Sequence, residues 1–213
     1  MFITFEGIDF SGKSTQCRLL GKFLKDKGYN TLLLREPGGT EISEKIRKLL
    51  LDKGSDGMFP LTEFLLYNAA RAQVVEEVIK PAHDSGKTVI CDRFYDSSTA
   101  YQGYGRGLPI KDVEFVNNFS TGGLEPDLTI IVDISVAESL RRLKLTGKQT
   151  DRIESEGTEF FETVRQGYLQ IATRNSSLLT HKKHRFKVVN GEDDINTVKR
   201  KIQEIVISEF ENT

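Results

Sequence analysis

Residues 7–14 read Gly-Ile-Asp-Phe-Ser-Gly-Lys-Ser and follow the short apolar run Phe2–Phe5. This stretch matches the pattern G-x-x-x-x-G-K-[ST] in the context that the pattern requires, after a strand and at the start of a helix. The glycines allow backbone N–H groups to turn toward phosphate oxygens, and the helix N-terminus favours the same anionic ligand. The sequence therefore predicts a phosphate-binding loop made of Gly7, Ile8, Asp9, Phe10, Ser11, Gly12, Lys13, Ser14 and Thr15.

Three side chains of this loop have separate predicted roles. Lys13 supplies a positive charge to the terminal phosphates of a nucleoside triphosphate, and Ser14 supplies a hydroxyl ligand for Mg²⁺. Asp9 is unexpected, because a carboxylate beside a triphosphate is repelled. It faces solvent or, as we favour, it accepts a hydrogen bond from a hydroxyl of a second substrate or holds Mg²⁺ through water.

Apolar runs of strand length alternate with segments of helical period along the whole chain. The predicted strands are Phe2–Phe5, Thr31–Leu34, Thr88–Asp92, Leu128–Asp133 and Phe186–Val189. The predicted helices are Lys13–Lys27, Thr40–Leu51, Leu61–Ile79, Ser97–Tyr101, Ile110–Ser120, one that starts at the capping box Ser135–Glu138, Thr158–Leu179 and Ile195–Phe210. Pro81 should kink or end the third helix. The glycine-rich residues 103–109 should form a loop, and the polar stretch Thr146–Gly157 should form a mobile lid and contribute little to the core.

Alternating strands and helices predict an α/β fold in three layers, with a five-stranded parallel sheet flanked by helices. At 213 residues, one domain spanning 1–213 is favoured over two small ones. Ligands of such sheets bind beyond the carboxyl ends of the strands. The loops after Phe5, Leu34, Asp92 and Asp133 should therefore meet at the site.

Composition excludes several classes of protein. The formal net charge of −1 gives no sign of the basic surface of a nucleic-acid-binding protein. Cys17 and Cys91 are too few and too far apart for a disulfide framework or a zinc site, so we expect two small core residues. No apolar window is long enough to cross a membrane, and the N-terminus lacks the basic region of a secretory signal. We expect a cytoplasmic protein without a membrane or nucleic-acid partner.

Charged residues follow two of the predicted strands. Asp92 ends an apolar strand, which is the usual form of a Walker B segment, so it can orient Mg²⁺ or its waters. Arg93 then lies at the mouth of the strand, where it can hold an anionic acceptor or the migrating phosphoryl group. Arg35 opens the turn Arg35–Thr40, in which Pro37 shapes the chain, and its guanidinium can reach a phosphate in the same crevice.

Tyr67 and Arg71 are four residues apart on one predicted helix and share a face. An aromatic ring beside a guanidinium suits a planar base, by stacking and by hydrogen bonding to a base carbonyl. Taken alone, such a pair is more often a core residue beside a surface charge.

The ordered segments EGIDFSGKST, REPGGT, LLYNAARAQ, DRFYDSSTAYQGYGRG, PDLTIIVD and DRIE closely resemble thymidylate kinases of the bacterial type. The resemblance covers nearly the whole chain. It implies a P-loop fold of the nucleoside triphosphate hydrolase type with a lid, and transfer of the γ-phosphate of ATP to dTMP with Mg²⁺. It also implies a homodimer.

The resemblance also assigns residues to the acceptor dTMP. It gives Asp9 the 3′-hydroxyl, places Tyr67 on the thymine ring and Arg71 at a thymine carbonyl. It implies that Arg93 and Arg35 hold the acceptor phosphate, with Pro37 in the turn beside them. Ser98 and Gln102 match positions near the base, and Tyr101 matches one against the deoxyribose, where it would exclude a ribose hydroxyl.

Two positions depart from many relatives. Some carry Arg at the position of Phe10, and without it the transition-state charge should be met from the lid, where Arg152 is the matching residue. An arginine that closes over the transferred group is worth roughly a thousandfold or more in rate; without the resemblance, Arg152 would be one charge in a solvated cluster. Relatives often have Arg-Gly at Thr146-Gly147, and that arginine can stack on adenine; here only Lys144 and Lys148 lie nearby.

Three other functions compete with this interpretation. A kinase for another nucleoside monophosphate would have the same fold. A GTP-dependent switch protein would need a guanine-reading N-K-x-D motif, which the sequence lacks. A non-catalytic nucleotide-binding module would not depend on Lys13 for its biological activity.

Overall fold

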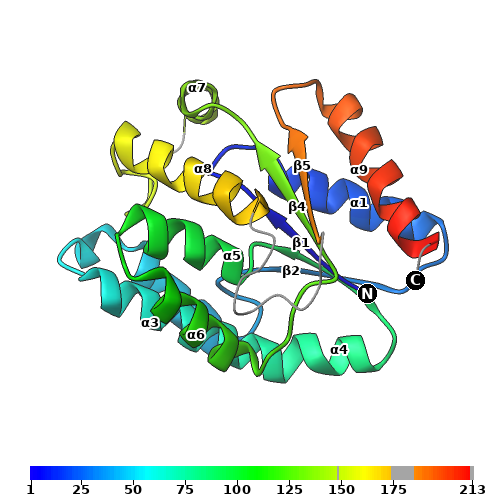
Figure 1. The fold of residues 1–213 in the computed structure, drawn as a ribbon, viewed down its shortest axis with the longest axis horizontal. Helices are drawn as coiled ribbons and strands as arrows, with labels where there is room; N and C mark the ends of the chain where they lie inside the picture. The colour runs from blue at the N-terminus through cyan, green and yellow to red at the C-terminus, as the bar shows by residue number, and fades with distance from the viewer. Residues whose placement is uncertain (148, 174–184, 212–213) are drawn as a thin grey trace.

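The computed structural model describes residues 1–147, 149–173 and 185–211. A five-stranded sheet lies between two layers of helices (Figure 1). Its strands are β1 (Phe2–Glu6), β2 (Thr31–Arg35), β3 (Thr88–Asp92), β4 (Leu128–Asp133) and β5 (Phe186–Asn190), in the order β2-β3-β1-β4-β5. All neighbouring strands are parallel. The predicted fold is confirmed, and each predicted strand end lies within one residue of the observed end.

Burial follows the place of each strand in the sheet. Every residue of the central strands β1 and β3 is buried, whereas the edge strands β2 and β5 are partly exposed. Apolar runs that are covered on both faces are typical of parallel sheets. The carboxyl ends of β1, β3 and β4 therefore lie together inside the molecule, with Glu6, Asp92 and Asp133 as their last residues.

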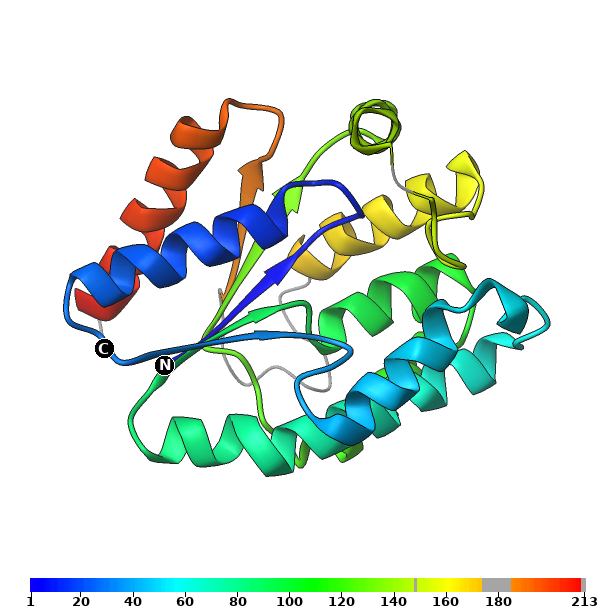
Figure 2. The same ribbon diagram turned by 180° about the vertical axis from the view of Figure 1, so that it is seen from behind.

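Helices cover both faces of the sheet (Figures 1 and 2). The helices are α1 (Lys13–Asp26), α2 (Glu41–Leu51), α3 (Pro60–Val74), α4 (Lys80–Asp84), α5 (Tyr95–Ser98), α6 (Ile110–Thr121), α7 (Val136–Thr146), α8 (Thr158–Thr173) and α9 (Ile195–Glu211). A 3₁₀ turn, η1 (Lys53–Ser55), follows α2, and two π-helical segments are η2 (Val75–Ile79) and η3 (Thr99–Gly105). The predicted helix Thr158–Leu179 extends into residues 174–179, which lie outside the described ranges.

Three groups of buried side chains hold the layers together, and two of them contain the cysteines. On one face, α1 and α9 pack on the sheet through Leu20, Leu24 and Val206, with the free thiol Cys17 among them. On the other face, α3, η2 and α4 pack against β1 and β3, where Cys91 is also a buried free thiol. Both cysteines are thus core residues, as expected. None of the described helices is both long enough and apolar enough to cross a membrane.

The predicted capping box before α7 is half formed. Ser135 Oγ accepts a hydrogen bond from Glu138 N at 3.3 Å, as a helix cap should. The reciprocal bond is replaced, because Ser135 N donates to Glu192 Oε1 at 2.8 Å. A side chain from the loop before α9 therefore fixes the start of α7.

Pro81 does not end the long helix that precedes it, so of the two predicted outcomes, a kink or an end, the end is wrong. The helix α3, the π-helical η2 and α4 follow one another without a gap from Pro60 to Asp84. Pro81 lies in the first turn of α4, directly after the π-helical turn. Pro81 has no N–H to donate, and the π-helical turn directly before it interrupts the regular i→i−4 hydrogen bonds, so the chain stays helical through the proline.

The predicted loop at residues 103–109 is wrong for its first part, since η3 continues to Gly105. The glycines there serve close packing between helices. A Cβ built on Gly105 would lie 2.8 Å from Phe160 Cε2 and from Val164 Cγ2 of α8. Glycine thus lets η3 approach α8, and this approach fixes the wall of the site described next.

Candidate active site

The loop between β1 and α1 has the strained backbone of a phosphate-binding loop. Gly7 has φ 137°, and a Cβ on it would lie 2.5 Å from Val132 O, so only glycine fits. Phe10 has φ 60° although it is not glycine. The side chain of Ile8 is buried in the core. The residues of this loop that line the cleft in front of it are Asp9, Phe10, Ser11, Gly12, Lys13, Ser14 and Thr15.

This cleft has a volume of about 720 Å³, and its lining carries charged side chains of both signs, the acidic ones being Asp9, Glu36, Asp92, Glu154 and Asp193. Its lining includes the cationic side chains Lys13, Arg35, Arg47, Arg93 and Arg142. Backbone N–H groups at the start of α1 add a favourable site for an anion. The cleft therefore suits a polyphosphate.

A second, smaller pocket of about 120 Å³ adjoins the cleft. Its lining contains most of the predicted acceptor-binding residues: Asp9, Pro37, Tyr67, Arg93, Ser98, Tyr101 and Gln102. Asp9, Glu36, Arg47, Arg93 and Glu154 line both spaces. A molecule in the small pocket would therefore approach a phosphate chain in the cleft at Asp9 and Arg93.

Arg93 is held at this junction from two sides. Its Nη2 donates to Asp9 Oδ1 at 2.7 Å and to Tyr101 OH at 3.1 Å. Its Nη1 lies 3.0 Å from each of three acceptors, Gly7 O, Ser97 Oγ and Tyr168 OH. The backbone of Arg93 is left-handed, with φ 74°, a conformation that persists only where surrounding contacts enforce it.

The charges of this group keep Asp9 ionised. Burial alone would raise the pKa of Asp9, but the charges of Arg93 and Lys13 lower it to about 2. Tyr101 OH also donates to Asp9 Oδ2 at 2.6 Å. Lys13 Nζ lies 3.9 Å from Asp9 Oδ1 and donates to Ile8 O at 3.2 Å. In this structure Asp9 is therefore paired with cations and does not simply face solvent.

Asp92 and Ser14 fit the predicted magnesium site. Both line the cleft. Asp92 Oδ1 is buried and has no hydrogen-bond partner among the described residues. A buried carboxylate oxygen without a donor needs compensation, and a hard cation bound with a phosphate supplies it.

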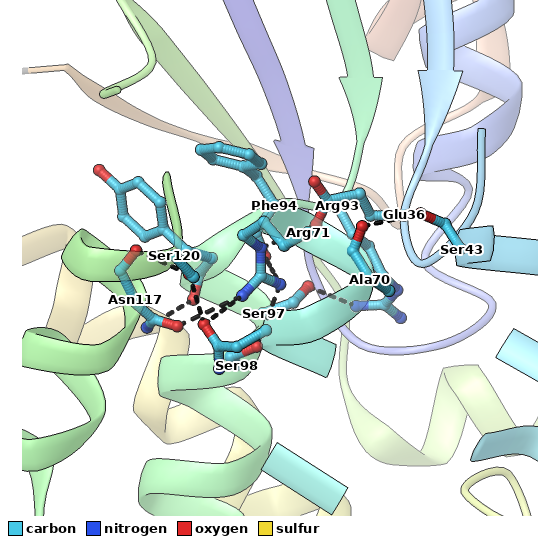
Figure 3. Close-up of polar contacts among 12 residues, drawn as sticks. Glu36, Ser43, Ala70, Arg71, Arg93, Phe94, Ser97, Ser98, Asn117 and Ser120 are labelled. Carbon is cyan, nitrogen blue, oxygen red and sulfur yellow. Dashed lines mark hydrogen bonds and ion pairs between the residues drawn. The ribbon is translucent and has the colours of Figure 1, made fainter. Parts of the chain in front are cut away.

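Arg71 is buried and does not line the small pocket. Figure 3 shows it surrounded by polar groups of the protein. Its guanidinium makes five hydrogen bonds, as many as it has N–H donors, and all are to protein groups. The bonds to Glu36 Oε2, at 2.8 Å, and to Ser98 Oγ, at 3.1 Å, hold two residues that do line the pocket. The structure thus places Arg71 in support of the wall and not at its surface.

Arg152 also lies away from both spaces. Its Nη2 is 2.7 Å from Oε2 of the fully buried Glu63 in α3, and its Nε donates to Leu50 O at 2.8 Å. Arg106 links the same Glu63, at 3.1 Å, to Glu156, at 2.6 Å. Among the lid residues that the structure describes, Ile153 is buried in the core, although the sequence predicted that this stretch contributes little to it. Lys148 lies outside the described ranges.

The remaining predicted residue, Arg35, lines the cleft and is half exposed, with its Nη2 2.8 Å from Glu44 Oε1. Sequence reasoning missed Arg47 and Arg142, because an arginine on an amphipathic helix gives no local signal of facing a cleft. Glu36 was also missed; the only signal in the sequence is its place in the turn that follows β2, and the structure shows that its buried Oε1 has no partner among the described residues. Glu6, directly before the loop, ended an apolar strand as Asp92 does and could have been found on that ground.

Comparisons with known proteins all lead to one family of enzymes. The sequence model described as Thymidylate kinase matches residues 5–202. The chain is 46% identical over 205 residues to a thymidylate kinase of Caldanaerobacter subterraneus subsp. tengcongensis, covering 96% of this chain and 94% of that protein. It is 47% identical over 210 residues to a thymidylate kinase of Kosmotoga olearia, covering 99% and 95%. The crystal structure of thymidylate kinase from Ehrlichia chaffeensis superposes with a TM-score of 0.76 at 36% identity and covers 97% of each chain. The chain belongs to the thymidylate kinase family.

Proposed function

We propose that this protein transfers the γ-phosphate of ATP to dTMP, giving dTDP and ADP. The main observation in support of this proposal is that the large cleft and the small pocket adjoin and share lining residues. The cleft over the phosphate-binding loop and the small pocket lined by Tyr67 and Gln102 share Asp9 and Arg93. Two nucleotides bound in them would meet phosphate to phosphate at these side chains.

The mechanism is an in-line phosphoryl transfer to which the protein contributes position and charge. Lys13 holds the terminal phosphates of the donor. Arg93 bridges donor and acceptor, because its fixed guanidinium faces both spaces. Asp9, ionised and next to Arg93, orients the acceptor through its 3′-hydroxyl. Preorganised charges of this kind stabilise the charge that develops on the migrating group.

Ser14 and Asp92 would hold Mg²⁺ on the donor phosphates. When bound there, the ion would supply positive charge that neutralises phosphate oxygens. The lid, residues 146–157, contributes Thr146 and Glu154 to the cleft and thus reaches the donor side. Its closure over the nucleotides would exclude water and prevent hydrolysis of ATP.

The small pocket supports a pyrimidine deoxynucleotide. Tyr67 supplies a ring for stacking on the base, and Ser98 and Gln102 supply hydrogen bonds. Tyr101 is fixed by its hydrogen bond to Asp9, so its ring would lie against the sugar and exclude a ribose hydroxyl. Arg71 acts on the base indirectly, by holding Ser98 and Glu36 in the pocket wall. A direct bond to a base carbonyl would require Arg71 to give up one of its present partners.

A panel of nucleoside monophosphates in an ADP-release assay tests the substrate. We expect dTMP to give the highest kcat/KM, with Lys13→Ala lowering kcat severely. A clear preference for dCMP or for a ribonucleotide would assign the protein to another monophosphate. Strong GTP binding without turnover that depends on an acceptor would favour a switch protein. A Lys13→Ala variant that keeps full biological activity would favour a non-catalytic binding module.

We propose that two copies of the chain associate through α3 and α6. Phe115 and Phe119 lie one turn apart on α6 and are 70% and 80% exposed, and Leu65 of the neighbouring α3 is 49% exposed. Contiguous exposed apolar side chains of this kind mark interaction surfaces. We assign a second copy of the chain to this surface, because the family resemblance implies a homodimer. We place the protein in the cytoplasm, where its nucleotide substrates are.

Phe119→Asp should convert the dimer into a monomer in sedimentation velocity, because a charge would be buried at the interface. An exposed apolar residue elsewhere, Val188 on β5, gives the matched control Val188→Asp, which should leave the dimer intact. A dimer that survives Phe119→Asp would place the interface on another face.

A further inference from the structure

Glu6 is a buried carboxylate next to the reaction site that lines neither the cleft nor the small pocket. It ends β1, directly before Gly7. Its Oε1 accepts a hydrogen bond from Phe94 N at 2.7 Å, and its Oε2 accepts from Ser97 Oγ at 2.5 Å and from Tyr168 OH at 3.0 Å. The three donors are all neutral groups. A buried carboxylate held only by neutral donors is costly to keep ionised, which calls for a reason.

The same two hydroxyl groups bind Arg93. Ser97 Oγ and Tyr168 OH each accept a hydrogen bond from Arg93 Nη1 at 3.0 Å, and they lie 2.8 Å from one another. Each hydroxyl has one proton to donate, and an ionised Glu6 receives it. Their oxygen lone pairs then face Arg93. The carboxylate thus sets the direction of both hydroxyl dipoles toward the guanidinium.

Glu6 also fixes the backbone that carries Arg93. Phe94 follows Arg93 in sequence, and its N–H is held by Glu6 Oε1. Arg93 itself has the left-handed φ of 74°. One carboxylate therefore restrains Arg93 at both ends, at the backbone directly and at the guanidinium through two hydroxyls. The four elements involved are β1, the turn after β3, α5 and α8.

We propose that Glu6 is a positioning residue for phosphoryl transfer, which acts through Ser97 and Tyr168 to orient Arg93 at the junction of the two substrate spaces. The inference rests on the proposed function of Arg93. It predicts that Glu6 matters for turnover although it touches neither substrate. The alternative is that Glu6 is a hydrogen-bonded core residue that only stabilises the fold. In that case its substitution would change the stability of the protein and leave kcat unchanged.

Glu6→Gln and Tyr168→Phe test the arrangement. The glutamine amide nitrogen would donate toward Ser97 and Tyr168 in competition with Arg93 Nη1. Each variant should lower kcat by roughly tenfold or more, as loss of an outer-sphere orienting group does. The double variant should lose little more than the worse single variant, because both act through Arg93. Glu204→Gln, at a carboxylate on α9 that pairs with Arg200 far from the site, is the control and should keep the wild-type kcat.

A pH profile separates positioning from stability. Burial, together with the charge of Asp96, raises the pKa of Glu6 from 4.5 to about 7. The other titratable or charged groups that face Glu6 are Arg93, Lys13, Cys91 and Tyr168. These groups are the same in the wild type and in Glu6→Gln. Protonated Glu6 presents a donor as glutamine does, so the ratio of wild-type to Glu6→Gln kcat should shrink toward one below about pH 7. Substrate phosphates also titrate, at about pH 6, but they do so with the wild type and with Glu6→Gln alike, so the ratio of the two kcat values is unaffected.

Several outcomes would overturn the proposal. A folded Glu6→Gln protein with wild-type kcat at every pH would do so, as would fully multiplicative effects of Glu6→Gln and Tyr168→Phe. If Glu6→Gln does not fold, the double variant Ser97→Ala, Tyr168→Phe replaces it, and wild-type turnover in that protein would also reject the role. All variants are compared on the monophosphate that the wild type prefers. If dTMP is not the substrate, the wild-type protein alone shows it, and this result is distinct from a failure of the role proposed for Glu6.

Discussion

Arg93→Ala should lower kcat by roughly a thousandfold or more, the loss expected when an arginine that stabilises the transferred phosphoryl group is removed. The guanidinium faces both substrate spaces and is fixed by five hydrogen bonds. Arg93→Lys should recover little of this loss. A lysine is a single point charge and cannot bond to Asp9 and to the Ser97 and Tyr168 hydroxyls at once.

Steady-state kinetics with dTMP and ATP, with thermal melts to confirm folding, measure this effect. Arg200→Ala removes an exposed arginine that pairs with Glu204 on α9 and should leave kcat unchanged. A variant with a raised KM for dTMP and an unchanged kcat would show that Arg93 binds the acceptor equally in the ground and transition states. That result would remove Arg93 from the catalytic group and leave it among the binding residues.

Arg152→Ala should also lower kcat severely, with a modest change in the KM for dTMP. As the lid arginine, Arg152 is the expected source of the charge that Phe10 cannot supply. In the structure its guanidinium is paired with Glu63. It must therefore exchange that partner for the phosphoryl group when the lid closes. Removal of Arg152 leaves Glu63 paired with Arg106 and Gln102, so the fold should survive.

Glu63→Gln distinguishes a catalytic role for Arg152 from an anchoring one. If Arg152 serves the phosphoryl group, Glu63→Gln leaves that arginine available and should cost far less activity than Arg152→Ala. If Arg152 only fastens the lid to α3, both variants break the same ion pair and should lose activity equally. Equal losses would contradict the catalytic assignment, and the charge would then come from another cation of the cleft, such as Arg142.

The sheet could be predicted from sequence because its signals are local. Apolar runs such as Leu128–Asp133 and the loop motif at Gly7–Ser14 each contain enough information to assign an element. The positions of Asp9, Asp92 and Arg93 then follow, since parallel strands bring their carboxyl ends to one edge. The π-helical segments could not be predicted in this way. Their hydrogen-bond period differs from that of an α-helix only slightly, and the choice depends on packing, as between Gly105 and α8.

The partners of buried charged side chains could not be predicted from sequence either. Arg152 is paired with Glu63 and Arg71 with Glu36, and the residues of each pair lie far apart in sequence. A charged residue in a polar segment gives the same signal whether it faces solvent or a buried carboxylate. Arg71 was therefore expected at the surface of the pocket and Arg152 on an open lid. Both are among the buried side chains.

The two core thiols give this chain an intrinsic reporter of its own opening. Cys17 and Cys91 are buried on opposite faces of the sheet, and burial raises the pKa of both, so neither is a reactive thiolate in the folded protein. Labelling by a thiol reagent then requires the core around α1 or β3 to separate. Since α1 starts in the phosphate-binding loop and β3 ends at Asp92, ligands that tighten the site should slow labelling at both cysteines. Occupancy of the site should then be measurable with a thiol reagent and the natural cysteines alone.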